Sequence, residues 1–244
     1  MKIPDWKWIL KWRVIYPVTH GHSYTKYYER AVRDAMFSMS GATFWDVGAN
    51  TGYYTIPLAE KFDEVTAIEP DPVALEFLRQ KIAKANLNNV RVLPVALSDS
   101  VGSSKLYTPT KVRRSSIGSV NSLIVPNEPS SKASPAQPAG VPLVEVQTDT
   151  IDHVLGERTI DLLKIDVEGA EFMVLKGGTN ALHEMRIKNM MIELHDWKRK
   201  SELDQLLSTN QYNVNWLDFA AEAATSHVLA TAARRPLPPE STQP

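Results

Sequence analysis

The sequence contains no cysteine among its 244 residues. This absence excludes a disulfide scaffold, a zinc site built on thiolates and a cysteine nucleophile. No run approaches the roughly 20 apolar residues needed to span a bilayer. The first residues also lack the apolar stretch and the small-residue cleavage site of a signal peptide. These absences predict a soluble, cytoplasmic protein.

An excess of charge of one sign is missing as well. The chain has 27 Lys and Arg against 28 Asp and Glu, which gives a formal net charge of −1 at pH 7. No overall field therefore attracts nucleic acid or an anionic membrane. The basic clusters are Arg113-Arg114 and the cations near the N-terminus. We expect no nucleic-acid partner.

The composition predicts one domain with one core, since 43% of the residues are hydrophobic and 23% are charged. We assign residues 41–235 to this domain and residues 236–244 to a disordered tail. Between about 109 and 142 the chain is rich in Pro, Ser and Ala, which excludes regular element interiors. This segment is predicted to be a mobile insertion that covers one edge of the sheet.

Residues 1–40 form an aromatic and basic segment followed by a helix from Tyr24 to about Met39. The aromatic residues of the segment are Trp6, Trp8, Trp12 and Tyr16. Such a composition suits a helix on a membrane surface. The interpretation we favour instead docks the aromatic rings on the domain and leaves the cations in solvent.

Short apolar runs alternate with stretches of helical spacing along the rest of the domain. The runs predict strands at 43–47, 65–68, 90–97, 160–165 and 190–194. Pro72 suits the start of a helix that spans about 72–85. Strands that alternate with helices predict a parallel sheet covered on both faces.

A glycine-rich turn, Asp46-Val47-Gly48-Ala49-Asn50-Thr51-Gly52, directly follows the first strand. Such a turn lets the backbone approach a ligand, and the helix after it offers free N–H groups. Glu69 ends the second strand, where a carboxylate can accept both hydroxyls of a ribose. The dinucleotide fingerprint fails, because its second and third glycines would fall on Asn50 and Tyr53. The turn resembles the first motif of class I S-adenosylmethionine-dependent methyltransferases.

Three further segments extend this resemblance. They are Val95-Ala96-Leu97-Ser98-Asp99 with Gly102, the stretch from Asp161 to Glu171, and Ile192-Glu193-Leu194-His195. With the turn they resemble the FkbM family of methyltransferases over roughly 43–195. The resemblance implies an α/β, Rossmann-like class I methyltransferase fold with a seven-stranded, mostly parallel sheet and helices on both faces. Its strand order is 3-2-1-4-5-7-6 with strand 7 antiparallel, so 214–217 and 227–230 become strands 6 and 7.

The same resemblance implies S-adenosyl-L-methionine as the cofactor and a hydroxyl of a small molecule or glycan as the methyl acceptor. The residues expected to bind the cofactor are Asp46, Gly48, Asn50, Gly52, Glu69, Ala96 and Leu97. Ala96 and Leu97 would lie against the adenine at the end of the third strand. Asp99 would bond the exocyclic amine of the adenine or cap its own loop.

Polar residues at the ends of the fourth and fifth strands are the candidates for catalysis, because the carboxyl ends of parallel strands border the ligand crevice. His195 can take a proton near neutral pH, and Asp166 can orient it or bind the acceptor. The alternatives are a histidine bonded to backbone and an aspartate that caps a helix beginning near Glu168. Glu168 is a candidate for substrate contact, although Glu168 and Glu171 also suit a helix start.

Lys164 and Glu193 each lie two residues before a strand end. They are predicted to meet across neighbouring strands, since an unpaired buried charge is costly. A structural ion pair is the preferred interpretation, and a role of Lys164 in proton transfer is the alternative. No close-spaced ligand motif is present, so no metal is predicted. The alternative set of metal ligands is Asp166, Glu193, His195 and Asp196.

Two rival functions remain at this stage. Enzymes of this fold that methylate amines often carry Asp/Asn-Pro-Pro-Tyr/Phe after the fourth strand, where this chain has Asp166-Val167-Glu168-Gly169. A non-catalytic nucleotide-binding domain would not need the polar residues at the strand ends. O-methylation is therefore preferred over N-methylation of a small molecule and over simple binding.

Overall fold

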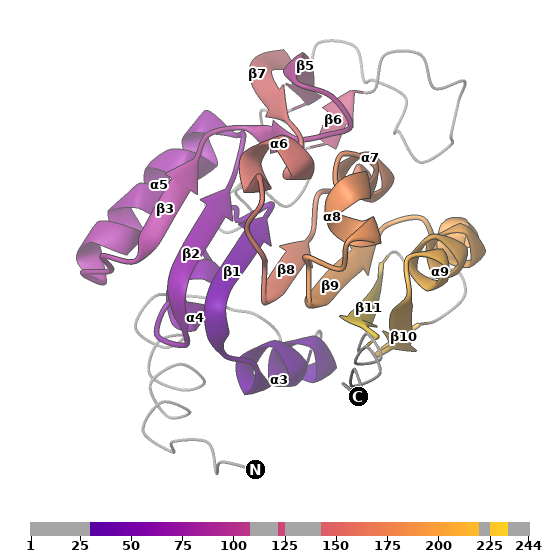
Figure 1. Cartoon of the computed structure of the whole chain (residues 1–244). Helices are drawn as coiled ribbons and strands as arrows, with labels where there is room; N and C mark the ends of the chain where they lie inside the picture. The colour runs from indigo at the N-terminus through magenta and orange to yellow at the C-terminus, as the bar shows by residue number, and fades with distance from the viewer. Residues whose placement is uncertain (1–29, 108–121, 125–142, 220–224, 234–244) are drawn as a thin grey trace, which may run out of the picture.

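The computed structural model describes residues 30–107, 122–124, 143–219 and 225–233 (Figure 1). The aromatic N-terminal segment, the first residues of the predicted helix 24–39, Arg113-Arg114, the C-terminal tail and most of the insertion lie outside the described residues. Within the described residues, no helix is long and apolar enough to cross a membrane.

The larger sheet has seven strands in the order β10-β11-β9-β8-β1-β2-β3. Its strands are β1 (Gly41–Val47), β2 (Phe62–Ile68), β3 (Val90–Leu93), β8 (Leu162–Ile165), β9 (Asn189–Leu194), β10 (Tyr212–Trp216) and β11 (Ser226–Ala232). β11 pairs antiparallel with β10 and β9, and the other pairs are parallel. The predicted order 3-2-1-4-5-7-6 is confirmed.

Helices cover both faces of this sheet (Figure 1). α3 (Arg30–Ser38) and α4 (Thr55–Leu58) pack on one face, where Val32, Met36 and Leu58 meet Phe44 of β1. Trp45 and Ile165 belong to the hydrophobic core on the opposite face. Its helices are α6 (Ile151–Leu155), α7 (Glu171–Lys176), α8 (Thr179–His183) and α9 (Lys200–Thr209), with a 3-10 turn η2 (Trp197–Arg199) before α9.

The burial of the strands follows from these two layers. All four residues of β8 are buried, as are the last four of β1 and of β2, because these central strands have helices on both sides. β3 and β10 are edge strands, and they bury far fewer side chains. The predicted helix 72–85 is confirmed as α5 (Pro72–Lys84), since Asp71 accepts the N–H groups of Val73 and Ala74 at its start.

The prediction of one strand over 90–97 is wrong. β3 ends at Leu93, and Pro94, which has no N–H to donate, separates it from β4 (Ala96–Leu97). β4 belongs to a second, four-stranded sheet of order β4-β7-β5-β6. The other strands of that sheet are β5 (Gly102–Tyr107), β6 (Ser122–Ile124) and β7 (Leu143–Asp149). β6 lies inside the insertion for which no regular element was predicted.

Candidate active site

The glycine-rich turn lies between β1 and α4, where it was predicted. Gly48 and Gly52 have φ angles of +76° and +86°, in the left-handed region that favours glycine. A Cβ on Gly48 would lie 1.8 Å from the backbone oxygen of Asp166, and one on Gly52 would lie 2.8 Å from Leu78 Cδ1. The turn is therefore packed tightly against the end of β8 and against α5.

Glu69 joins this turn to the end of β2. Its Oε2 accepts a hydrogen bond from the Asn50 N–H, and its Oε1 accepts one from the Asp71 N–H, both at 2.8 Å. The residue is 6% exposed, and burial raises its pKa to about 7. A carboxylate oxygen has two lone pairs, so each Glu69 oxygen retains one for a hydroxyl donor.

Asn50 carries a second feature that suits a ligand. Its Oδ1 is buried and accepts no hydrogen bond from the described residues. A buried acceptor without a donor costs about 1–3 kcal/mol. A ligand N–H or ammonium group at this turn would supply the missing donor.

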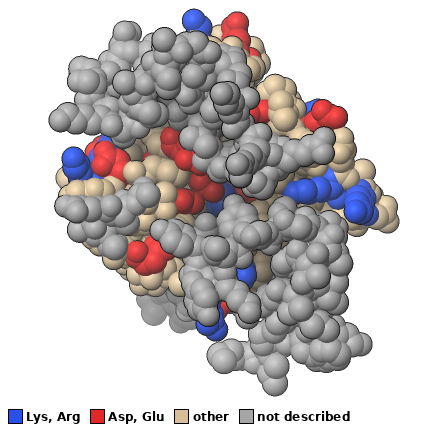
Figure 2. Space-filling view, turned by 180° about the vertical axis from the view of Figure 1, so that it is seen from behind, with Lys and Arg blue, Asp and Glu red and all other residues tan. Residues whose placement is uncertain are grey.

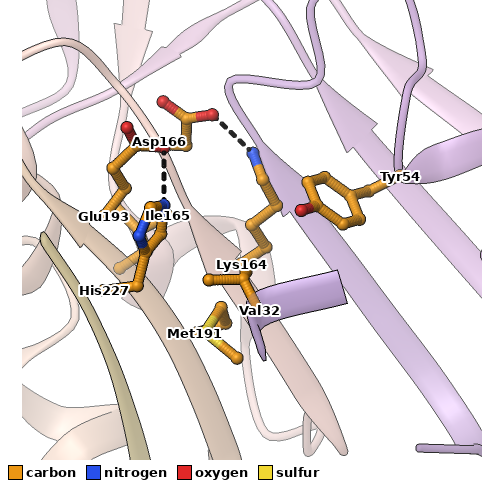
Figure 3. Close-up of a pocket in the computed structure, with 8 residues that line it drawn as sticks. All are labelled: Val32, Tyr54, Lys164, Ile165, Asp166, Met191, Glu193 and His227. Carbon is orange, nitrogen blue, oxygen red and sulfur yellow. Dashed lines mark hydrogen bonds and ion pairs between the residues drawn. The ribbon is translucent and has the colours of Figure 1, made fainter. Parts of the chain in front are cut away.

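A row of charged side chains crosses four neighbouring strands on the sheet face that α3 and α4 cover: Asp46 of β1, Lys164 of β8, Glu193 of β9 and His227 of β11. Lys164, Glu193 and His227 line a small cavity together with Val32, Tyr54, Ile165, Asp166 and Met191 (Figure 3). The charges alternate in sign along the row. Each can therefore find an opposite charge next to it, which a buried charge requires.

Lys164 is bound by two carboxylates. Its Nζ lies 3.1 Å from Asp166 Oδ2 (Figure 3) and 3.4 Å from Asp46 Oδ1, while Thr55 Oγ1 donates to Asp46 Oδ2 at 2.6 Å. Burial alone would lower the pKa of Lys164, but Asp166 and Asp46 outweigh it and raise this pKa above its ordinary value. Lys164 stays protonated at physiological pH, so it is a poor proton acceptor.

The predicted ion pair between Lys164 and Glu193 is wrong. Lys164 stands opposite Asp46 in the register of β8 and β1, and Glu193 stands opposite His227 in the register of β9 and β11. Glu193 Oε2 lies 3.3 Å from His227 Nε2 (Figure 3). Burial alone would raise the pKa of Glu193, but His227 outweighs it and lowers this pKa to about 2.

His195 lies among carboxylates at the end of β9. Its Nδ1 is 2.6 Å from Glu171 Oε1, and its Nε2 is 3.4 Å from Glu168 Oε2 and 3.8 Å from Glu193 Oε1. Burial alone would lower the pKa of His195, but its bonds to Glu168 and Glu171 outweigh this and raise the pKa to about 11. The two carboxylates therefore favour the protonated ring, and the role of His195 as a proton acceptor near neutral pH stays a prediction.

Glu171, like His227 of β11, is a site residue that the sequence did not reveal. It is 2% exposed, and its Oε1 also accepts the Gly169 N–H at 2.8 Å. A carboxylate at the first residue of a helix is typical of a cap, and no local pattern distinguishes it from a carboxylate that holds a histidine.

Asp166 and Glu168 lie in the connection between β8 and α7. α7 begins only at Glu171, with Ala170 at its N-cap, so Asp166 does not cap that helix. Glu168 has a φ of +54°, a left-handed conformation that is uncommon for a side-chain-bearing residue. One ligand atom from each of Asp166, Glu168 and His195 lies within 4.8 Å of the others.

Ala96 and Leu97 are 4% and 2% exposed, and both side chains belong to apolar clusters. They can reach a ligand only through backbone groups, and their contact with adenine stays a prediction. Asp99 accepts a hydrogen bond from Lys176 Nζ at 2.8 Å.

The strand order and the turn after β1 define the Rossmann-like fold of class I methyltransferases. A crystal structure of an FkbM methyltransferase from Methylobacillus flagellatus has this fold, with a TM-score of 0.54 and 15% identity. The match covers 78% of this chain and 43% of that one.

The sequence model of the methyltransferase FkbM domain matches residues 46–214. The chain belongs to the FkbM methyltransferase family. It is 28% identical over 219 residues to methyltransferase sdnD of Sordaria araneosa, a match that covers 78% of this chain and 80% of the relative. It is 27% identical over 173 residues to the hexuronic acid methyltransferase AglP of Haloferax volcanii, covering 67% of this chain and 60% of that relative.

Proposed function

We propose that this protein transfers a methyl group from S-adenosylmethionine to a hydroxyl group of a small molecule or sugar. One observation carries the proposal: the glycine-rich turn touches the backbone of Asp166, since a Cβ on Gly48 would lie 1.8 Å from the Asp166 oxygen. A ligand held by the turn therefore lies beside the carboxylates of Asp166 and Glu168.

The residues of the turn fit the cofactor. Asn50 Oδ1, buried and without a donor, suits the ammonium of the amino-acid end, and Glu69 suits the ribose hydroxyls. Backbone groups of Ala96 and Leu97 suit the adenine. Asp46 pairs with Lys164 and accepts a hydrogen bond from Thr55, the first residue of α4. These contacts stabilise the glycine-rich turn. When bound, the cofactor supplies a methyl group on a positively charged sulfur.

The acceptor end must align a hydroxyl and take its proton. The hydroxyl oxygen forms the new C–O bond as the C–S bond breaks, and the hydroxyl proton has to leave. Burial raises the pKa of Glu168, which makes this carboxylate a better proton acceptor than an exposed one. His195 orients Glu168 through its Nε2, and the proton passes from the carboxylate to water.

Three observations support a hydroxyl of a small molecule or sugar as the methyl acceptor. A relative of 27% identity is a hexuronic acid methyltransferase, which favours a sugar acceptor. On the face shown in Figure 2, the described Lys and Arg side chains lie in separate groups, and Asp and Glu gather near the centre. A nucleic acid would need a continuous basic stripe. Residues 166–169 also lack the motif typical of amine methylation.

A transfer assay with methyl-labelled S-adenosylmethionine tests the proposal. The acceptors are hexuronic acids, neutral sugars, hydroxylated natural products and the matching amino sugars. We expect label on a hydroxyl oxygen, and Asp166→Asn should lower the rate while the cofactor still binds. Label only on amines, or no transfer to any acceptor by protein that binds the cofactor, would contradict the proposal.

A further inference from the structure

We infer that Asp166, Glu168 and His195 form a binding site for one divalent cation of the Mg²⁺ or Mn²⁺ type at the acceptor end of the crevice. Cation binding itself is independent of methyl transfer, but its chemical role rests on the proposed function. The site differs from the set that the sequence offered as an alternative, since Glu168 replaces Glu193 and Asp196.

The spacing of the donor atoms suits one ion. One atom from each of the three side chains lies within 4.8 Å of the other two. Two ligands on opposite sides of a Mn²⁺, Mg²⁺ or Ca²⁺ ion are roughly 4–5 Å apart, because each bond is about 2.0–2.6 Å long. The three residues follow the ends of two neighbouring parallel strands, β8 and β9. An ion bound here would displace the proton between His195 Nε2 and Glu168.

The second observation lies outside these three residues. Glu171 is 2% exposed and lies 2.6 Å from His195 Nδ1, which directs Nε2 toward Glu168. In protein metal sites a ligating histidine almost always gives its other ring N–H to a carboxylate or carbonyl group. Here the buried Glu171 holds the ring, and the Gly169 N–H holds Glu171 in turn at 2.8 Å.

The pairing of the neighbouring charges determines which oxygens are left for an ion. Lys164 Nζ holds Asp166 Oδ2, which leaves Asp166 Oδ1 for the ion. Glu193 has its own cation in His227, 3.3 Å away, so it stays outside the ligand set. Two carboxylates with one imidazole suit Mg²⁺ or Mn²⁺ rather than a metal that prefers thiolates.

The ion would act on the acceptor hydroxyl. A hydroxyl bound to a divalent cation loses its proton more readily, because the cation stabilises the developing negative charge. A carboxylate that binds the ion through one oxygen keeps a second oxygen for the departing proton. Glu168 can therefore bind the metal with one oxygen and accept the proton with the other.

The direct test is a titration of Mn²⁺ into the metal-free full chain, followed by electron paramagnetic resonance. We expect one Mn²⁺ per chain, displaced by Mg²⁺. Glu171→Gln should weaken Mn²⁺ binding about 10–100-fold, the range for a carboxylate that holds a ligand. Asp166→Asn and Glu168→Gln should weaken it at least as much. The matched control Glu64→Gln, an exposed glutamate of β2, should leave it unchanged.

A second measurement needs no variant. Mn²⁺ broadens the nuclear magnetic resonance signals of nearby protons, so the ring signals of His195 should broaden before those of His153 and His183. No Mn²⁺ binding, equal binding in all variants, or broadening that begins at another histidine would overturn the inference. Site-specific Mn²⁺ binding without transfer to any hydroxyl would refute the proposed function alone. Full transfer in a chelator, with no Mn²⁺ bound, would refute the metal alone.

Discussion

The two halves of the crevice are built in different ways. The half around Gly48 and Glu69 is held by backbone groups, since Glu69 accepts two backbone N–H groups and Gly48 has room for no side chain. The half around His195 is held by side chains that contact other side chains. Glu171 of α7, Glu193 of β9 and the turn residue Glu168 all lie within 4 Å of its ring nitrogens.

This difference determines how each half should respond to substitution. The half around Gly48 and Glu69 depends on the backbone conformation of the turn. Substitutions in this half should therefore affect folding and cofactor binding together. A half built from side chains can lose one group without a change in the backbone of the glycine-rich turn, and after loss of His195 the buried Glu171 still accepts the Gly169 N–H. Turnover and cofactor binding should therefore separate in variants of the His195 half.

The largest expected effect is on turnover, in His195→Ala. His195→Ala removes the group that orients Glu168, the proposed proton acceptor, and loss of general-base catalysis typically costs about 10²–10⁴-fold in rate. We expect a loss in that range for methyl transfer, measured on an acceptor found in the labelled assay, with cofactor affinity near wild type. His183→Ala, an exposed histidine of α8, is the matched control. Equal losses of cofactor affinity and rate would erase the distinction between the two halves.

The next effect is on stability, in Gly48→Ala. The new Cβ would collide with the Asp166 oxygen and sit at a φ of +76°, so we expect unfolding to become easier by about 2–5 kcal/mol. Gly156→Ala shares a positive φ of +58° but has nothing within 4 Å. It should cost only the backbone strain, about 1–3 kcal/mol. The free energy of unfolding of both variants is measured by urea denaturation. Equal losses would show that the close approach of Gly48 to Asp166 is unimportant for stability.

A smaller effect concerns pH. Burial raises the pKa of Glu69 to about 7 in the free protein, so the protonated form is favoured on folding. Its stabilising contribution is full below the ordinary pKa of a glutamate and is lost as the pH rises through about 7. Cofactor affinity should change in the opposite direction, falling about tenfold per pH unit below about 7, because ribose hydroxyls need the ionised form. Glu69→Gln should remove both dependences.

The sequence predicted the positions of the glycine-rich turn and of Glu69 because both depend on local order, and their binding of the cofactor stays a prediction. A strand, a turn with two glycines and an acid at the end of the next strand are adjacent in the chain, and parallel pairing brings them together. The His195 half joins residues that are distant in sequence. Lys164 binds Asp46 and Asp166 instead of Glu193, and nothing in a single sequence gives the register that decides this.

The second sheet escaped prediction for a related reason. β5 and β7 carry many exposed or partly exposed side chains, and their pairing joins segments on either side of a long Pro-rich stretch. Pro94 separates β4 from β3, and neighbouring apolar residues on both sides of it suggested one continuous strand.

The central claim, that the turn and Glu69 bind S-adenosylmethionine, is tested most directly by titration calorimetry at pH 8. Wild type, Glu69→Ala and the control Glu64→Ala are compared. The account predicts that Glu69→Ala weakens binding by about 1–3 kcal/mol, the range for a hydrogen bond to a charged group, and that Glu64→Ala binds like wild type. Equal affinity in all three proteins would contradict the assignment of the ribose to Glu69.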